Sequence, residues 1–553
     1  MINLKQKAVQ QHDFSMIPRA DIPRSSFRMK KALKTAFSFS KLIPIFCEEV
    51  LPGDTYKGSC TIVARTATPI VPILDNWHLE TFFFFVPNRL VWTNWQKFMG
   101  EQTNPGDSIS YTIPRVTAPN SGYAIATIGD YFGLPTVGQI TGGVRSDHNA
   151  LPFRAYNLIF NQWFRDENLT TSLPNNTGNG PDTYTDYAVQ YRGKRHDYFT
   201  SSLPFVQKGT AVPLPIGTSA PVKTGATEYS TTGGTALTVR RAATGAFPTT
   251  DRYFVSGSNG VMSEAGSGVV GVNTIYPTNL YADLALATGG TINQLRLAFQ
   301  IQKLMERDAR GGTRYKEIIL AHFGVQSADG RLDRPEYIGG GYAPILTNAI
   351  PQTSATGLTG GTTPAGSLAA TGYAQSQQGF TYSSTEHGYI IGMACGRADL
   401  TYQQGQRKHW NRSTRYDYYF PAFANLGEQA VTNREIYAIG SATGGEAVND
   451  QDSLVFGYQE RWAEMRYTPS EITGIFRANA ASNLAFWHSS QLFSALPTLN
   501  NTFIVDQAET VLQRNFAAGA ATVGQQLLCD MFFDMNVARP LPMYSVPGLM
   551  DHF

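Results

Sequence analysis

The chain carries few of the residue patterns that support enzyme chemistry. No two of its nine histidines are three or four residues apart, the spacing that lets one helix hold a metal ion. The H-E-x-x-H, G-x-x-x-x-G-K-[ST] and G-x-S-x-G patterns are absent. Residues 266–271 match G-x-G-x-x-G, but their flanks are loop-like and the next acid, Asp283, follows after only 12 residues. The sequence therefore predicts no catalytic residue, no cofactor and no metal site.

Basic side chains are concentrated at the beginning of the chain. Residues 1–41 hold nine Lys or Arg against two Asp, although the whole chain carries only +2. We expect this segment to be an extended basic arm that binds phosphates. Its predicted nucleic-acid contacts are Lys5, Lys7, Arg19, Arg24, Arg28, Lys30, Lys31 and Lys34. A solvated tail, or an arm packed on a neighbouring subunit, would explain the same charge.

A second group mixes cations with aromatic rings in residues 403–419. Its candidate residues are Arg407, Lys408, Trp410, Arg412, Arg415 and Tyr416. Basic residues interleaved with aromatics fit a surface for single-stranded nucleic acid. They fit a subunit interface equally well, because Arg, Trp and Tyr dominate binding hot spots. We favour the interface.

Composition indicates which elements must position these groups. The 553 residues include 52 Gly and 30 Pro, and only 16% are charged, against roughly 25% in ordinary soluble domains. Such a chain favours short strands, many turns and surface buried against partners. The longest strongly apolar run, 82–86, is far shorter than the roughly 18 residues that span a bilayer. We expect no membrane insertion.

Several strands can be placed from alternation. Residues 527–537 alternate apolar and more polar side chains, with Cys529 among the apolar set. Residues 78–86 are too aromatic for a helix and predict a strand buried on both faces. Residues 434–439 and 454–467 are further strand candidates. The four cysteines lack zinc spacing, and we expect them to act as small hydrophobic side chains.

Helices and loops fill the remainder. Helical spacing of apolar residues predicts helices over 153–168 and 292–310, the second ended by Gly311 and Gly312. Residues 208–292 are rich in Thr and Gly and predict an exposed excursion. Residues 352–379 predict a second loop of the same kind.

Ordered segments along most of the chain resemble a known family. They include HDFS (12–15), LIPIFCEEVLPGDT (42–55), TFFFFVPNRLVWTNWQKFMGE (81–101), TEHGYIIGM (385–393) and PGLMDHF (547–553). In these segments the chain resembles the major capsid proteins of microviruses, in particular the gokushovirus type. These viruses are small icosahedral bacteriophages with single-stranded DNA.

The resemblance implies a fold and a function. The fold would be a viral jelly-roll β-barrel, all-β dominated, with eight antiparallel strands and large, partly helical loop insertions. About sixty copies would assemble into a T=1 shell around a single-stranded DNA genome. The protein would be a structural component of the virion, assembled in the host bacterial cytoplasm. Its partners would be other copies, the packaged DNA, and a DNA-pilot protein and small internal proteins.

The same resemblance divides the chain into four parts. Residues 1–41 would be a basic arm facing the DNA, and 42–207 the first part of the jelly roll with a helical insertion. Residues 208–292 would form a surface insertion at the three-fold axes, with a role in host attachment to a receptor that the sequence does not identify. Residues 293–553 would complete the jelly roll with long loops between strands.

Two other functions fit parts of the sequence. One is a soluble single-stranded-DNA-binding protein, which the arm and residues 403–419 favour. The other is a carbohydrate-binding or glycan-hydrolysing β protein, which the Tyr and Trp content favours. Particle size separates these alternatives from a shell protein, because only the shell runs in the megadalton range.

Overall fold

The computed structural model describes residues 23–212, 292–312, 315–324, 333–353, 366–440 and 451–544, together with short strands between 222 and 282. The chain forms two compact units, and each is described by itself. The first comprises Met1–Val206 and Gln326–Phe553, and the second comprises Gln207–Val325. Within the described residues, no helix combines the length and the apolar character that crossing a membrane requires.

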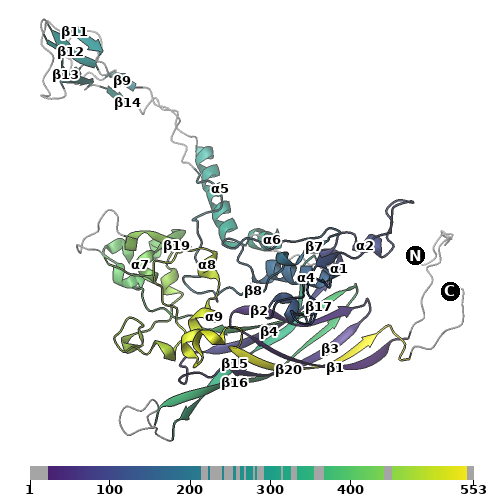
Figure 1. Cartoon of the computed structure of the whole chain (residues 1–553). Coiled ribbons are helices and arrows are strands. Elements are labelled where there is room, and N and C mark those ends of the chain that lie inside the picture. Colours follow the sequence, from purple (N-terminus) through teal and green to yellow (C-terminus); the bar gives the residue numbers. More distant parts are fainter. Residues whose placement is uncertain are drawn as a thin grey trace, which may run out of the picture. The chain divides into compact units, whose positions relative to one another are not determined.

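The first unit is built on a nine-stranded sheet in which every pair is antiparallel (Figure 1). The order across the sheet is β1-β20-β3-β16-β15-β4-β17-β2-β8. The strands are β1 (Ser25–Phe37), β2 (Lys41–Val50), β3 (Thr55–Thr66), β4 (Trp77–Pro87), β8 (Gln190–Tyr191), β15 (Glu336–Pro351), β16 (Leu368–Ser383), β17 (Gly388–Ala398) and β20 (Leu527–Arg539).

The connectivity of this sheet is that of a jelly roll. Without the two-residue β8, eight strands remain, and their pairing along the chain is nested. The first pairs with the eighth (β1 with β20), the second with the seventh (β2 with β17), the third with the sixth and the fourth with the fifth. The sheet curls until Lys31 on β1 lies 3.2 Å from Glu48 on β2. The predicted fold is confirmed.

Aromatic rings fill the inside of the curl. Phe46, Phe83, Phe380 and Phe533 come from four different strands and form one cluster, in which Phe83 and Phe380 stack with centroids 4.5 Å apart. Glycines make room for these rings. A Cβ at Gly58 would lie 2.8 Å from the ring of Phe380, and one at Gly392 would lie 2.7 Å from the ring of Phe83. Each glycine stands directly opposite that ring on the adjacent strand, so a larger residue there would displace the ring from the core.

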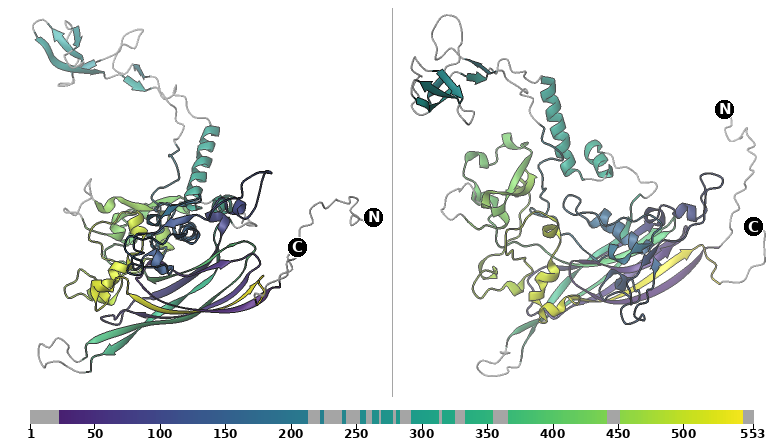
Figure 2. Two further views of the ribbon diagram at one scale, coloured as in Figure 1. Left: turned by 45° about the vertical axis from the view of Figure 1, so that its right-hand side comes forward. Right: turned by 45° about the horizontal axis from the view of Figure 1, so that its top comes forward.

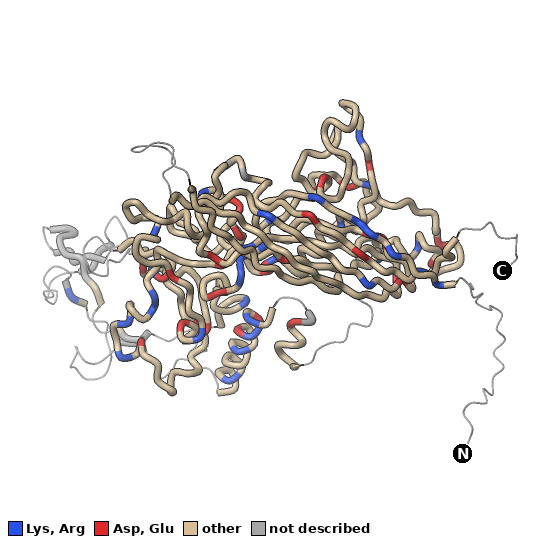
Figure 3. The backbone as a smooth tube through the Cα atoms, turned by 90° about the horizontal axis from the view of Figure 1, so that it is seen from below, with Lys and Arg blue, Asp and Glu red and all other residues tan. Residues whose placement is uncertain are grey.

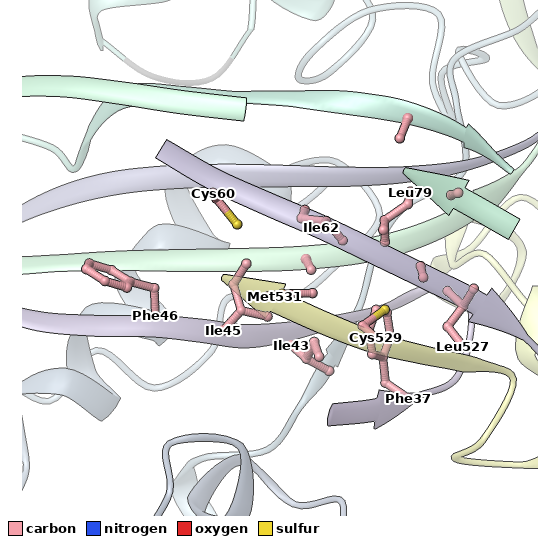
Figure 4. Close-up of a cluster of buried hydrophobic side chains, with 14 of the residues drawn as sticks. Phe37, Ile43, Ile45, Phe46, Cys60, Ile62, Leu79, Leu527, Cys529 and Met531 are labelled. Atoms are coloured by element: carbon pink, nitrogen blue, oxygen red, sulfur yellow. The ribbon is translucent and has the colours of Figure 1, made fainter. Parts of the chain in front are cut away.

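Strand β20 shows the predicted alternation. Every second side chain from Leu527 to Val537 is buried in the core, and the intervening ones are exposed or half-buried. Figure 4 shows Cys529 and Met531 among Phe37, Ile43 and Ile62. Burial raises the pKa of the Cys529 thiol to about 12. The thiol is therefore protonated and packs as a small hydrophobic group.

A large insertion covers one side of the sheet (Figure 2). Strand β4 is buried on both faces, as predicted, because Phe83 and Phe85 face the core while Phe84 and Val86 face the insertion. The predicted helix over 153–168 is present as α4 (Leu151–Ile159) and a π-helical turn (Phe160–Phe164). Further short elements are α1 (Asn88–Val91), α2 (Trp95–Phe98), β5 (Arg115–Thr117), α3 (Ile128–Tyr131), β6 (His148–Asn149) and β7 (Asp182–Thr183).

A buried ion pair fixes this insertion. Arg154 of α4 is 2% exposed and forms a bidentate pair with Asp182, at 2.7 and 2.8 Å. It also donates to the carbonyl oxygens of Val91 and Gly178. One guanidinium therefore joins the helix to two loops, and its charge is balanced inside the fold.

A second group of insertions lies between β17 and β20. It contains β18 (Glu428–Thr432), α7 (Asn433–Ile436), β19 (Val455–Glu460), α8 (Asn501–Ile504) and α9 (Ala508–Val511). The strand predicted over 434–439 is wrong, because Thr432 and Glu435 form a capping box that begins α7 and residues 437–439 form no strand. The candidate over 454–467 contains the shorter strand β19.

The second unit contains the predicted helix α5 (Ile292–Arg310), which ends at Gly311 and Gly312, the latter with φ +89°. It also contains α6 (Tyr315–Phe323) and the strands β9 (Val222–Thr224), β10 (Val239–Arg241), β11 (Tyr253–Ser256), β12 (Met262–Gly266), β13 (Val269–Pro277) and β14 (Leu280–Ala282). Gly266 pairs with Val269 in the β12–β13 hairpin, so the G-x-G-x-x-G match is no dinucleotide site. The rest of 213–291 lies outside the described residues.

The second predicted loop, 352–379, is wrong in its extent. Residues 368–379 belong to β16. Along this strand, exposed Thr, Gln and Gly residues alternate with buried residues such as Ala370, Ala374 and Phe380. A composition rich in Gly, Ser, Thr and Gln masked this period-two pattern. Residues 354–365 lie outside the described residues.

We predict that Cys529→Ser destabilises the subunit by roughly 1–3 kcal/mol, because the substitution places a hydroxyl in an apolar layer. Denaturant unfolding of the unassembled subunit measures this change. Asn536→Ser, at an exposed position of the same strand, is the matched control and should be close to neutral. Equal stability of the Cys529→Ser and control variants would mean that the core face of β20 is misassigned.

Candidate nucleic-acid and subunit interfaces

The second half of the basic segment is a strand and not an arm. Residues 25–37, which we predicted as part of an extended arm over 1–41, form β1 and pair with β20 along its whole length. The reason is a period-two pattern in which Phe27, Met29 and Leu33 turn toward the core and Phe37 is buried in it. Lys31 occupies one of these inward positions and hides the pattern in the sequence. The predicted contacts Lys5, Lys7 and Arg19 lie outside the described residues.

The cations of β1 have acidic partners. Arg28 lies 2.6 Å from Asp534 and Lys34 lies 3.2 Å from Asp530, both on the adjacent strand β20. The hydrogen bond from Arg28 holds the pKa of Asp534 below its usual range. Lys31 points inward and pairs with Glu48. All of these pairs except Lys31–Glu48 lie on an exposed surface, where such pairs are worth little and exchange readily with solvent.

Two further cations stand beside these pairs. Arg24 donates to the carbonyl oxygen of Gly53 and to the Thr55 hydroxyl. Lys30 is exposed and has no ion-pair partner among the residues that the structure describes. Its ammonium group is therefore available to an external anion.

The side chains of strands β1, β20, β3 and β16 that point away from the core form one exposed surface, which we call the open face. Its charged side chains are Arg28, Lys30, Lys34, Lys57, Arg65, Asp530 and Asp534. Five are basic and two are acidic, and Figure 3 views the molecule from this side with the basic residues in blue. Strand β16 adds only uncharged side chains, chiefly Thr and Gln. A positive face with many hydroxyl and amide groups suits a phosphate backbone.

Sequence reasoning missed two residues of the open face, Lys57 and Arg65. They alternate with Tyr56, Cys60 and Ala64, which are buried in the core. This period-two pattern over 55–66 is the signal that would have identified them. The face also exposes the ring of Phe532 (42%), on which an unpaired base can stack.

The cations of the second predicted group hold the fold together. Arg407 pairs with Glu471, Lys408 with Glu435 at 3.4 Å, and Arg412 with Glu464 at 3.1 Å. These six side chains line a cavity of about 210 Å³. Because the three positive charges are balanced internally, they favour phosphate binding less than their sequence suggests.

The aromatic residues of that segment are exposed instead. Trp410 and Tyr416 are each 70% exposed, and Tyr418, Tyr419 and Phe420 are also accessible. Arg415 lies 5.3 Å from the ring centre of Phe420. We call residues 410–420 the aromatic segment. Because three of the four cations in this group are paired with carboxylates, the exposed aromatics favour a protein interface over nucleic acid.

One cluster of cations was not found from the sequence. Arg192, Arg195 and Arg397 all contact Glu80 on β4, beside a cavity of about 490 Å³ that is also lined by Lys194. Burial lowers the pKa of Lys194 to about 8 and that of Arg192 to about 10. The residues come from three distant segments, so no local pattern reveals them. Their shared carboxylate makes the cluster a structural junction.

The described residues contain no group of three or more His, Cys, Asp or Glu side chains placed to hold a metal ion. The four cysteines are free thiols, and three of them are buried. The geometry thus offers binding surfaces, namely the open face and the aromatic segment.

Comparison with known proteins agrees with this arrangement. The family model described as "Capsid protein (F protein)" matches residues 15–549. Capsid protein VP1 of Bdellovibrio phage phiMH2K is 43% identical, with 98% of both chains covered. Capsid protein VP1 of Chlamydia phage 1 is 42% identical, with 99% of both covered, and that of Spiroplasma virus 4 is 38% identical, with 97% covered.

These matches span nearly the whole chain and confirm the resemblance to microvirus capsid proteins. They agree with the binding surfaces found on the described residues. The chain belongs to the phage F capsid protein family and is a structural protein of the virion, not an enzyme.

Proposed function

We propose that about sixty copies of the chain form a closed T=1 shell around single-stranded DNA, with the open face toward the genome. One observation carries this proposal: the two sides of the curled sheet differ. The insertion buries the outer side of β4 and β17, whereas the open face is exposed and carries five basic and two acidic side chains. A wall with one covered side and one open, positive side suits a container for a polyanion.

The open face binds the phosphate backbone of the DNA and not its bases. Each phosphate contact with a single strand contributes a salt dependence of about −0.7 in log affinity per log salt concentration. Two or three contacts per copy, repeated over the shell, retain a genome without reading its sequence. The carboxylates of Asp530 and Asp534 compete for Arg28 and Lys34. This competition keeps each contact weak and exchangeable.

Residues 1–22 extend the same function. They precede β1, which belongs to the open face, and they include Lys5, Lys7 and Arg19. Their three basic side chains add to Arg24 and Lys30 in the proposed contact with the genome. The DNA-pilot protein and small internal proteins that accompany such shells are the other proposed internal partners.

The remaining surfaces serve contacts between proteins. The aromatic segment binds neighbouring subunits, with Trp410 and Tyr416 as its most exposed rings. Residues 208–292 serve host attachment. They fall entirely within the compact unit Gln207–Val325, which can vary without disturbing the jelly roll.

The first prediction separates the two halves of the basic segment. Deletion of residues 2–22 leaves β1 intact, so particles should form but contain less DNA. Deletion of residues 2–34 removes most of β1 and leaves β20 without its partner, which should cost more than about 4 kcal/mol of subunit stability. Thermal unfolding and the ratio of DNA to protein in purified particles measure both effects. Normal DNA content after the shorter deletion would refute the role of residues 1–22.

The second prediction concerns the open face. The double variant Lys30→Glu and Arg65→Glu should fold and assemble but release DNA at lower salt. Loss of two phosphate contacts reduces the salt slope by about 1.4. Arg145→Glu, at an exposed position of the insertion, is the matched control and should retain DNA. The same DNA retention in both variants would place the genome on another surface.

The third prediction concerns host attachment. Replacement of residues 220–285 by a short linker should leave particle assembly intact, because this segment belongs to the second unit. Adsorption to host cells should fall at least tenfold, measured by counting unadsorbed particles over time. Unchanged adsorption would show that another surface contacts the host.

A further inference from the structure

The hairpin of β15 and β16 extends beyond the rest of the sheet. The pairing of β15 with β4 ends at Ile345, opposite Trp77, and the pairing of β16 with β3 ends at Tyr373, opposite Arg65. Residues 346–351 and 368–373 continue as a two-stranded ribbon, paired from Leu346–Tyr373 to Pro351–Leu368. Figures 1 and 2 show this ribbon projecting past the neighbouring strands. We call it the ribbon.

The ribbon lies in a long segment without charge. Residues 337–385 contain no Lys, Arg, Asp, Glu or His, although 44 basic, 42 acidic and nine His residues are distributed over the chain. Exposed strands in soluble proteins are normally protected by charged side chains, Pro or bulges, because their free edges associate with other chains. Here that protection by charge is missing where the strands are most exposed.

One face of the hairpin carries an apolar stripe. On β15 it consists of Tyr342, Leu346 and Ile350, which are 70%, 63% and 48% exposed. Tyr373 of β16 stands directly opposite Leu346 and is 37% exposed. We call these four residues the apolar stripe. Contiguous exposed apolar surface of this kind marks a binding site.

A ribbon of two strands is also marginally stable in water by itself. Among the described residues no strand pairs with its outer edges beyond Ile345 and Tyr373, and the neighbouring segment contacts it through the Ala370 N–H to the Pro69 carbonyl oxygen and the Thr347 hydroxyl to the Ile73 carbonyl oxygen. A partner that covers the apolar stripe would supply the burial that a third strand or a helix supplies elsewhere.

We propose that the ribbon is a subunit contact and that its apolar stripe packs on a second copy of this chain. Nucleic acid does not fit, because a site for a polyanion needs cations and residues 337–385 have none. A second copy fits, because members of this family form shells and because the chain has an apolar groove of its own. That groove, of about 580 Å³, is lined by residues of 119–137 and 184–191, and its sole charged lining residue is Lys41.

Such a contact joins two different surfaces of identical chains. Head-to-tail contacts of this type generate rings and, with further contacts, closed shells. The inference rests on shell formation as proposed above, and it adds the element that makes one of the contacts.

Photo-cross-linking tests the proposal in assembled particles. Benzoylphenylalanine at position 346 should yield, after dissociation, a covalent species of twice the chain mass. The same group at Thr381, an exposed position of β16 on the open face, is the matched control and should yield no such dimer. Cross-links from position 346 only to DNA, only to another virion protein or only within one chain would overturn the proposal, as would their absence.

A double variant provides a second test. Leu346→Asp with Ile350→Asp changes exposed side chains only, so thermal unfolding of the subunit should stay within about 2 °C of the original. Particle yield should fall at least tenfold. Ala349→Asp, which adds charge to the opposite face of the same strand, should assemble far better.

The outcomes are distinguishable. Normal particles from the double variant, or an equal loss from Ala349→Asp, would overturn the role of the apolar stripe. Failure of the unaltered chain to form particles would instead refute the shell itself.

Discussion

The pairing of the first long strand with the last is the constraint on which the rest of the structure depends. Strand β1 begins at Ser25 and pairs with β20, which ends at Arg539. All other long strands pair inside this outermost pair, in nested order. The strands of each pair are antiparallel, and most are hydrogen-bonded to a further strand on the other side. The long intervening segments therefore leave the sheet only at strand ends. An insertion can therefore grow without breaking a hydrogen-bonded pair, and a chain of 553 residues can retain one jelly roll.

The same constraint gives the sheet two different sides. Four phenylalanines fill the inside, and Gly58 and Gly392 leave room for the rings of Phe380 and Phe83 on the adjacent strands. On the outside, aromatic residues of β4 such as Phe84 require a cover, which the helical insertion provides. Strand β20 instead alternates strictly and leaves polar or charged groups outward. The outer face of β4 and β17 is thus covered by this chain's own insertion, and the open face remains available for a ligand.

The parts of the fold that could be predicted are those with a local period. The alternation in β20, the doubly buried β4 and the helices α4 and α5 follow directly from side-chain spacing. The error over residues 25–37 has a physical cause, because Lys31 occupies an inward position and pairs with Glu48, 17 residues away. The Glu80 cluster and the ion pairs of Arg407 and Arg412 depend on contacts between distant segments. Charge alone therefore overestimated the basic residues that are free to bind DNA.

Charge also distinguishes the surfaces by the kind of partner they suit. The open face keeps an excess of cations, but two of them have carboxylates within 3.2 Å, so at those two sites a phosphate must displace an existing partner and gains little. Weak, repeated contacts hold a polymer while letting it slide, which a container needs during filling and release. The ribbon has the opposite character, because it has no charge to attract DNA and exposes apolar rings and aliphatic groups. In the proposed shell, contacts between copies depend on apolar burial, which salt does not screen, whereas contacts with the genome weaken as salt rises. A shell built in this way can loosen its hold on the genome without loosening the wall.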